Sequence, residues 1–301
     1  MKGAIHIGTS GWSYKHWKNI FYPPKLKPAE WIHFYSDHFK TTEINGSFYK
    51  LPSEETVVEW TKKVTDDFLF CPKMSRFLTH MKKLNEPEEP LERFFGIFEP
   101  IKKMMGPVLL QLPEILKFNY DKAEHLYRLM KTSYKKYEFV MEARHDSWFT
   151  EQSLTLMTKY DIGLVISQSG ERFPYSETIT AKNIYVRFHG PYQLYASSYS
   201  ENMLKAFAKK NQEMGERRSH CMGLFQQRYS WLCNWKRRQV NQITRKIKSS
   251  DVVAAFYKVF SKVIIFILFI VVGINHKIVV INFAFINITF QFNIILFFVA
   301  A

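Results

Sequence analysis

The sequence predicts a parallel α/β fold, and a (β/α) barrel in particular. Over the first two thirds of the chain, short apolar runs alternate with longer amphipathic segments, which is the pattern of repeated strand–helix units. Polar and charged residues gather where the short runs end. The length of 301 residues also suits one such domain, since an α/β barrel typically needs about 250 residues.

Seven short apolar or β-branched runs are expected to form the strands. They are Ala4–Gly8, Thr41–Asn45, Phe68–Lys73, Val108–Leu112, Phe139–Ala143, Ile162–Ile166 and Ile184–His189. Seven strands fit either a closed barrel that lacks one strand or an open doubly wound sheet.

The segments between these runs have the periodicity of amphipathic helices. We expect helices over Ala29–Phe39, Ser53–Val64, Leu91–Met105, Tyr120–Tyr134 and Gln152–Tyr160. Ser53 is a candidate N-cap for the second of them.

Polar side chains at the strand ends favour the barrel over the open sheet. A barrel brings the carboxyl ends of its strands to one mouth, whereas an open sheet spreads them along a crevice. The residues concerned are Thr9, Ser10, Trp12, Glu43, Asn45, Lys73, Gln111, Glu142, Arg144, His145, Arg187 and His189.

Four of these residues are candidate catalytic groups, namely Glu43, Glu142, His145 and His189. Carboxylates and imidazoles are the usual general acids and bases. Each also has a structural alternative: Glu43 and Asn45 fit a helix cap, and Glu142 with Arg144 fits an ion pair.

Candidate ligand-binding residues add cations, amides and aromatic rings at the same mouth. They are Trp12, Tyr14, Asn45, Tyr49, Lys73, Gln111, Arg144 and Arg187. Lys73, Arg187 and His189 together suggest an anionic substrate, and the aromatic rings could stack on a sugar or a base. Two carboxylates and two histidines could also hold a divalent metal, but no spacing supports such a site, so metal binding is the less favoured interpretation. The sequence indicates no particular cofactor.

These residues favour a small-molecule or carbohydrate-type enzyme of unassigned reaction, with its ligand at the barrel mouth. A nucleic-acid-processing barrel is the alternative, because the mouth is basic and rich in aromatic residues. A defective gene product without activity is the third alternative.

The distribution of charge along the chain bears on whether the partner is a nucleic acid. The net charge is +15, but residues 211–301 hold 12 Lys or Arg and 3 Asp or Glu, so the rest of the chain carries only +6. The whole-chain charge is therefore weak support for a nucleic-acid partner.

The cysteines match no zinc or disulfide spacing; they are Cys71, Cys221 and Cys233. Cys71 is expected to be a buried, inert thiol. The N-terminus has no secretory hydrophobic region, which suggests a cytoplasmic protein.

Several motifs, in order, make residues 4–205 similar to the YecE-like family, a domain of unknown function numbered 72. They are Gly8-Thr-Ser-Gly-Trp12, Phe21-Tyr-Pro23, Thr42-Glu-Ile-Asn45, Phe48-Tyr49, Leu51-Pro52, Thr79-His80, Gly106-Pro, Leu110-Gln-Leu-Pro113, Glu142-Ala-Arg-His145, Ser147-Trp148 and Tyr185-Val-Arg-Phe-His-Gly190. The resemblance implies a TIM-like (β/α)8 barrel but no particular reaction.

The resemblance also implies an eighth strand, approximately V-Y-V-Y-F-N-N-D, that this sequence lacks. Cys221–Lys236 stands in its place. Back-translated and read one nucleotide later, this stretch permits V-W-V-Y-F-N-N-D-I-H-G-Y-A-I-G-N-A. We therefore hypothesise a one-nucleotide frameshift near Lys210, from a mutation or a sequencing error, with the eighth strand and helix missing or disrupted.

The hypothesis divides the chain into a barrel domain, 1–210, and an out-of-frame tail, 211–301. Residues 252–301 contain no Asp or Glu, as expected of adenine- and thymine-rich DNA read without selection. Val252–Ile274 could instead span a membrane if Lys258 and Lys262 reach the surface. Any membrane association is expected only through residues 252–301.

Overall fold

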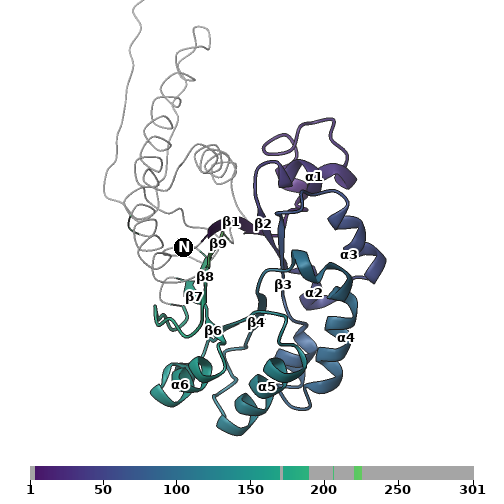
Figure 1. The fold of residues 1–301 in the computed structure, drawn as a ribbon. Coiled ribbons are helices and arrows are strands. Elements are labelled where there is room, and N and C mark those ends of the chain that lie inside the picture. The colour runs from purple at the N-terminus through teal and green to yellow at the C-terminus, as the bar shows by residue number, and fades with distance from the viewer. Residues whose placement is uncertain (1–3, 170–171, 190–205, 207–219, 226–301) are drawn as a thin grey trace, which may run out of the picture. The chain divides into compact units, whose positions relative to one another are not determined.

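The computed structural model describes residues 4–169, 172–189, 206 and 220–225. All of them belong to one compact unit, Met1–Val259, and the second unit, Phe260–Ala301, lies outside the described residues. Strands and helices alternate along the unit (Figure 1). The predicted parallel α/β class is confirmed.

The strands lie close to their predicted positions. They are β1 Ala4–Ser10, β2 Thr41–Ile44, β3 Leu69–Pro72, β4 Val108–Gln111, β5 Phe139–Glu142, β6 Gly163–Leu164, β7 Ile166–Gln168, β8 Asn183–Phe188 and β9 His220–Phe225. The sixth predicted run is divided into β6 and β7, with Val165 between them.

The helices are α1 Trp31–Ser36, α2 Gly46–Tyr49, α3 Glu54–Thr61, α4 Glu88–Phe98, α5 Tyr120–Ser133 and α6 Glu151–Lys159. Short helical turns cover Lys15–Trp17, Pro28–Glu30, Glu99–Met104 and Asp146–Phe149, and a π-helix covers Phe77–Met81. The predicted helix Leu91–Met105 ends early because Pro100 cannot continue the hydrogen-bond ladder. Ser53 caps α3 as predicted, and its Oγ accepts from the backbone N–H of Thr56 at 3.3 Å.

All strand pairings within the described residues are parallel. One sheet has the order β3-β2-β1-β9-β8-β7 and a second has the order β4-β5-β6. Two isolated bridges, Phe70 to Met105 and Lys73 to Leu109, connect the β3 and β4 sides, and Val165 connects β6 to β7 along the chain. The fold is thus a TIM-like barrel whose ladder of hydrogen bonds is interrupted and does not close.

The eighth position of this barrel holds β9. His220 pairs with Ala4 of β1 and with Asn183 of β8, and the two registers run in step to Phe225. The expected loss of the eighth strand therefore does not extend to the backbone of His220–Phe225. The helix that would follow, and the remainder of the proposed out-of-frame tail, lie outside the described residues.

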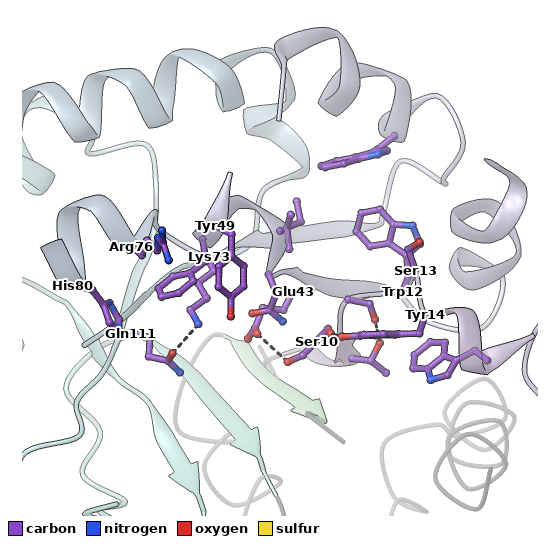
Figure 2. Close-up of a pocket in the computed structure, with 18 of the residues that line it drawn as sticks. Ser10, Trp12, Ser13, Tyr14, Glu43, Tyr49, Lys73, Arg76, His80 and Gln111 are labelled. Atoms are coloured by element: carbon purple, nitrogen blue, oxygen red, sulfur yellow. Dashed lines mark hydrogen bonds between the residues drawn. The ribbon is translucent and has the colours of Figure 1, made fainter. Parts of the chain in front are cut away.

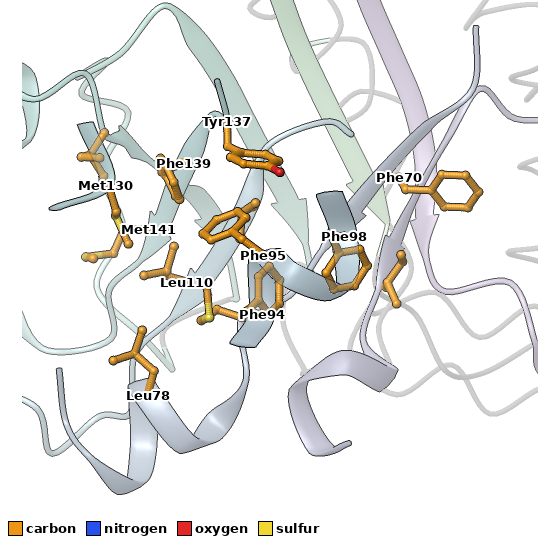
Figure 3. Close-up of a cluster of buried hydrophobic side chains, with 14 of the residues drawn as sticks. Phe70, Leu78, Phe94, Phe95, Phe98, Leu110, Met130, Tyr137, Phe139 and Met141 are labelled. Carbon is orange, nitrogen blue, oxygen red and sulfur yellow. The ribbon is translucent and has the colours of Figure 1, made fainter. Parts of the chain in front are cut away.

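The strands separate two kinds of core. Alternate side chains of a strand point to opposite faces. Toward the helices, Figure 3 shows Phe70, Leu110 and Met141 packed with Phe94, Phe95 and Phe98 of α4. The opposite face carries a smaller apolar cluster of Cys71, Leu109, Val140, Val165 and Tyr185. This second cluster forms the floor beneath the polar residues at the strand ends.

Cys71 in this floor is fully buried, and burial raises the pKa of its thiol to about 12. Such a thiol is neutral at physiological pH and is a poor nucleophile. The predicted inert role of Cys71 is in agreement with this environment.

Gly8, in the motif Gly8-Thr-Ser-Gly-Trp12, lies where β1 and β2 pack closely. A Cβ on Gly8 would lie 2.1 Å from the carbonyl oxygen of Thr41, far inside van der Waals contact. Gly11, three residues later, turns the chain with φ of +91°. Gly8 thus lets β1 approach β2, and Gly11 directs the following loop over the strand ends.

No helix among the described residues is long and apolar enough to cross a membrane. The predicted apolar stretch, 252–274, lies outside that part of the chain.

Candidate functional site

The polar face of the strands opens into a cavity of about 990 Å³. Side chains from the ends of β1, β2, β3 and β4 and from the segments that follow them form its wall. Figure 2 shows Lys73, Arg76, His80 and Gln111 at one end and Trp12 and Tyr14 at the other, with Glu43 between them. The predicted convergence of strand-end residues at one mouth therefore occurs.

Strand alternation places a layer of charged side chains directly above the apolar floor. Four residues of the floor are followed, two positions later in the same strand direction, by a residue of this layer: Cys71 by Lys73, Leu109 by Gln111, Val140 by Glu142 and Tyr185 by Arg187. Glu43 enters the same layer from β2. We call Glu43, Lys73, Gln111, Glu142 and Arg187 the charged layer.

Glu43 is fully buried and has a full set of donors. Arg187 donates from Nε to Oε2 at 3.0 Å and from Nη2 to Oε1 at 2.7 Å. The hydroxyl of Ser10 donates at 2.9 Å and that of Tyr185 at 3.1 Å. Burial favours protonation, but Arg187, together with Lys73 and the hydroxyl of Ser10, lowers the pKa of Glu43 below its ordinary value. Glu43 is thus a fixed carboxylate at neutral pH.

Glu142 is held in a similar way. Arg144 donates from Nε and Nη2 to Oε1, both at 3.1 Å, Gln111 donates to Oε2 at 3.0 Å, and Arg187 donates from Nη1. Burial opposes ionisation, but Arg187 and then Arg144 hold the pKa of Glu142 well below its ordinary value. One guanidinium therefore joins two buried carboxylates.

His189 lies next to this pair, with Nε2 3.4 Å from Oε1 of Glu142. Burial and the nearby Arg187 lower the pKa of His189 despite the attraction of Glu142. The imidazole is therefore neutral at physiological pH, and it does not supply the third cation that the sequence suggested.

Lys73 differs from the arginines because its partner is neutral. Its Nζ donates to Oε1 of Gln111 at 2.7 Å and lies 3.9 Å from the centre of the Phe48 ring. Burial is the main reason that the pKa of Lys73 falls to about 7; Arg187 adds to the shift, and Glu43 and Glu142 oppose it.

His80 lines the cavity beside Lys73. Its Nδ1 is 2.9 Å from the hydroxyl of Thr79, and its ring meets that of Phe48 edge to face at 5.0 Å. Burial, with Lys73, Arg144 and Arg76 nearby, lowers the pKa of His80 to about 4. The imidazole is neutral at physiological pH and can accept or pass a proton.

The other end of the cavity is aromatic. Trp12 and Trp60 meet edge to face with ring centres 5.1 Å apart, and the ring centre of Tyr14 lies 4.9 Å from that of Trp17. Two tyrosine hydroxyls fix the loop after β1: Tyr14 donates to the carbonyl of Ser10, and Tyr22 donates to that of Trp12 at 2.5 Å. The rings are thereby held in place before any ligand arrives.

Most of the predicted ligand-binding residues lie in the cavity wall. They are Trp12, Tyr14, Asn45, Tyr49, Lys73, Gln111 and Arg144. Arg187 lies behind the wall, where it is 0% exposed and joins the two carboxylates.

The predicted catalytic residues occupy three different places. Glu43 is in the wall, whereas Glu142 and His189 are buried behind it. The Nδ1 of His145 accepts from the N–H of Ser147 and caps a short helical turn outside the wall. Any catalytic role of these four residues stays a prediction.

The wall residues that sequence reasoning did not select include Trp60, Arg76, His80 and Met81. Arg76, His80 and Met81 follow β3 directly, in the loop and the π-helix Phe77–Met81. The rule that the segments after barrel strands form the mouth would have pointed to these three. Trp60 lies on α3, where its helical spacing resembles that of an ordinary core residue.

No group of three or more His, Cys, Asp or Glu side chains in the described ranges has the arrangement of a metal site. The wall residues thus give no structural reason to assign a particular metal or cofactor.

Two curated proteins of similar sequence are each described as a UPF0759 protein. The chain is 26% identical to YecE of Escherichia coli K12 over 147 residues, 49% of this chain and 51% of YecE. It is 27% identical to YunF of Bacillus subtilis 168 over 163 residues, 51% of this chain and 56% of YunF. The matches thus span about half the length of these relatives.

Solved structures extend the likeness over most of the fold. A DUF72 family protein of Thermotoga maritima, TM1631, superposes with a TM-score of 0.69 at 28% identity, covering 80% of this chain and 99% of that one. EF0366 of Enterococcus faecalis, another DUF72 protein, gives 0.65 at 18% identity and covers 82% and 99% of the two chains. Residues 6–231 match the family "Protein of unknown function DUF72", so the match continues past Lys210. The chain therefore belongs to the DUF72 family.

Proposed function

We propose that the barrel is an enzyme that binds a small anionic, sugar-like molecule in the cavity beside Glu43. The observation that carries the proposal is the division of the cavity into a cationic end and an aromatic end. Small-molecule sites typically combine apolar or aromatic walls with a few polar groups that fix orientation.

Arg76 makes the cationic end available to an anion. Its side chain is exposed and has no hydrogen bond or ion pair with any described residue. Arg144 also reaches the wall, although its guanidinium already contacts Glu142 and stacks 4.3 Å from the Phe173 ring centre. A phosphate or carboxylate would gain a charge-assisted hydrogen bond from Arg76 without displacing an internal partner.

The remainder of the wall suits a polyhydroxylated body. Trp12 and Trp60 offer ring surface on which the apolar face of a sugar can lie. The side chain of Asn45 has no hydrogen bond with a described residue and can serve a hydroxyl group. A sugar phosphate has the matching chemistry at both ends.

Thermal unfolding in the presence of sugar phosphates tests this proposal. Glucose 6-phosphate and ribose 5-phosphate are compared with glucose and ribose, using the full-length chain. A ligand at 100 times its Kd stabilises the fold by about 2.7 kcal/mol, which is readily measured as a higher Tm. We expect the phosphorylated sugars to raise the Tm more than the neutral sugars.

The variant Arg76→Gln sharpens the test. Loss of one charge-assisted hydrogen bond is expected to weaken binding of the stabilising phosphate at least about tenfold, measured by calorimetry. Arg93→Gln removes an exposed arginine from α4, away from the cavity wall, and is expected to leave affinity unchanged. Equal affinities for Arg76→Gln and the unmodified chain would refute the anion site.

A nucleic-acid ligand is the second candidate, and one observation favours it. Tyr49 is 67% exposed and lies at the mouth with Arg76, an arrangement that can stack on an unpaired base. Binding of a single-stranded oligonucleotide that weakens steeply with salt, and that Tyr49→Ala abolishes, would support this candidate over the sugar-like ligand.

A further inference from the structure

Lys73 stands apart from the arginines around it. Arg187 contacts Glu43 and Glu142 within salt-bridge distance, and Arg144 contacts Glu142. Lys73 contacts no carboxylate of the described residues at that distance, and its hydrogen-bond acceptor is the amide oxygen of Gln111. A buried cation without a counterion is costly, so its neutral form is favoured.

The two nearby carboxylates have no unused capacity for Lys73. Glu43 accepts four hydrogen bonds, from Ser10, Tyr185 and twice from Arg187. Glu142 accepts from Gln111, from Arg187 and twice from Arg144, and Nε2 of His189 lies 3.4 Å from its Oε1. Two carboxylates and two guanidinium groups balance, so a proton on Lys73 would leave the buried group with a net positive charge.

Position makes the Lys73 amine usable as well as neutral. The residue is 6% exposed, and it is part of the cavity wall. The hydrogen bond to Gln111 and the ring of Phe48 fix the position of Nζ. A neutral amine keeps both contacts, because one N–H still donates to the amide oxygen and the ring still covers one side.

The surroundings favour the neutral form of Lys73 on balance. Burial, and then Arg187 and Arg144, lower the pKa of Lys73 to about 7, against the attraction of Glu43 and Glu142. His80, on the same side of the cavity, is neutral at this pH. A substantial fraction of the Lys73 side chains therefore carries a free electron pair at physiological pH.

We infer that Lys73 is a nucleophilic amine that forms an imine with an aldehyde or ketone carbon of the ligand. The inference rests on the proposed function and narrows its substrate class to anionic sugar-like molecules with a carbonyl group. The nitrogen electron pair forms the new C–N bond while the carbonyl π electrons move to oxygen. Transfer of a proton from nitrogen to oxygen gives a carbinolamine. After a further proton reaches that oxygen from solvent, the C–O bond breaks, water leaves, and the C=N bond forms.

Competitive reductive methylation of the full-length chain tests the inference directly. Trace formaldehyde and cyanoborohydride at pH 7 form and reduce an imine at any neutral, accessible amine. Peptide mass spectrometry then compares Lys73 with Lys50 and Lys117, both exposed. An ordinary lysine is only about 0.04% neutral at pH 7, so we expect Lys73 to react at least about ten times faster despite its burial.

Labelling of Lys73 no faster than Lys50 and Lys117 would overturn the inference, whether the cause is a protonated amine or a closed cavity. This result can be separated from failure of the proposed function. A slow Lys73 together with tight sugar phosphate binding removes the imine and keeps the anion site. A fast Lys73 in a chain that binds no sugar phosphate keeps the reactive amine and removes the proposed ligand.

Discussion

The charged side chains of the site form two regions that differ in how their charges are paired. In the first, Glu43, Glu142 and Arg187 share direct contacts, and each of these buried charges has a partner of opposite sign. In the second, Lys73 and Arg76 have no carboxylate contact with the described residues. The first region is built as a closed framework, and the second is open to a ligand.

This difference indicates where specificity and reactivity should be sought. A buried ion pair contributes little net stability compared with apolar side chains of the same size, but loss of one partner is costly because the other charge stays buried. Mutations in the paired framework should therefore act mainly on folding, whereas mutations of Lys73 and Arg76 should act mainly on ligand binding or on protonation.

The largest expected effect is that of Arg187→Leu. It leaves Glu43 and Glu142 without their shared cation, so we expect a loss of about 3–5 kcal/mol of unfolding free energy at pH 7, measured by urea denaturation. The matched control is Arg172→Leu, which breaks an exposed pair with Glu114 and should cost less than about 1 kcal/mol. Similar losses for the two variants would mean that Arg187 is not the shared cation of Glu43 and Glu142.

Gly8→Ala should have the next largest effect. The new Cβ would meet the Thr41 carbonyl at 2.1 Å and force β1 away from β2, which carry Ser10 and Glu43. Such overpacking typically costs about 1–3 kcal/mol, which thermal unfolding would detect.

Gly96→Ala is the control for that variant. A Cβ on Gly96 meets nothing within 4 Å, and the residue lies inside α4, so the change should stabilise the protein by about 0.5–1 kcal/mol. If both glycine variants were stabilised, the close approach of β1 and β2 would not be a constraint.

Strand-end reasoning predicted much of the site because the barrel topology itself brings strand ends together. Glu43, Lys73 and Gln111 could be selected once their strands were recognised, since each stands at a strand's carboxyl end. The distinction between framework and wall could not be predicted. It depends on which carboxylate each cation reaches, and side chains far apart in sequence, such as Glu43 and Arg187, decide that.

The frameshift hypothesis for the final third of the chain stays a prediction. The frameshift hypothesis placed the break near Lys210, yet the family match continues to residue 231 and the backbone of His220–Phe225 pairs with both neighbouring strands. Strand pairing uses backbone groups, so it tests the path of the chain and not the identity of the side chains. Resequencing the gene across the codons for residues 200–240 tests the hypothesis itself.

The effect most specific to the wall is a pH-dependent change in the stability of Lys73→Met. Lys73 has a pKa of about 7 in the folded protein and an ordinary value near 10.4 when unfolded. Between these values the unfolded chain binds more protons, so stability rises with pH. From pH 7 to pH 9 the unmodified protein should gain about 2 kcal/mol relative to Lys73→Met. Urea denaturation at both pH values measures the gain. The control variant Lys117→Met, at an exposed lysine, should show no such pH-dependent difference from the unmodified protein.

A difference between the unmodified protein and Lys73→Met that stayed constant with pH would mean that Lys73 is protonated like any surface lysine. The contrast between a paired framework and a neutral amine in the wall would then be lost.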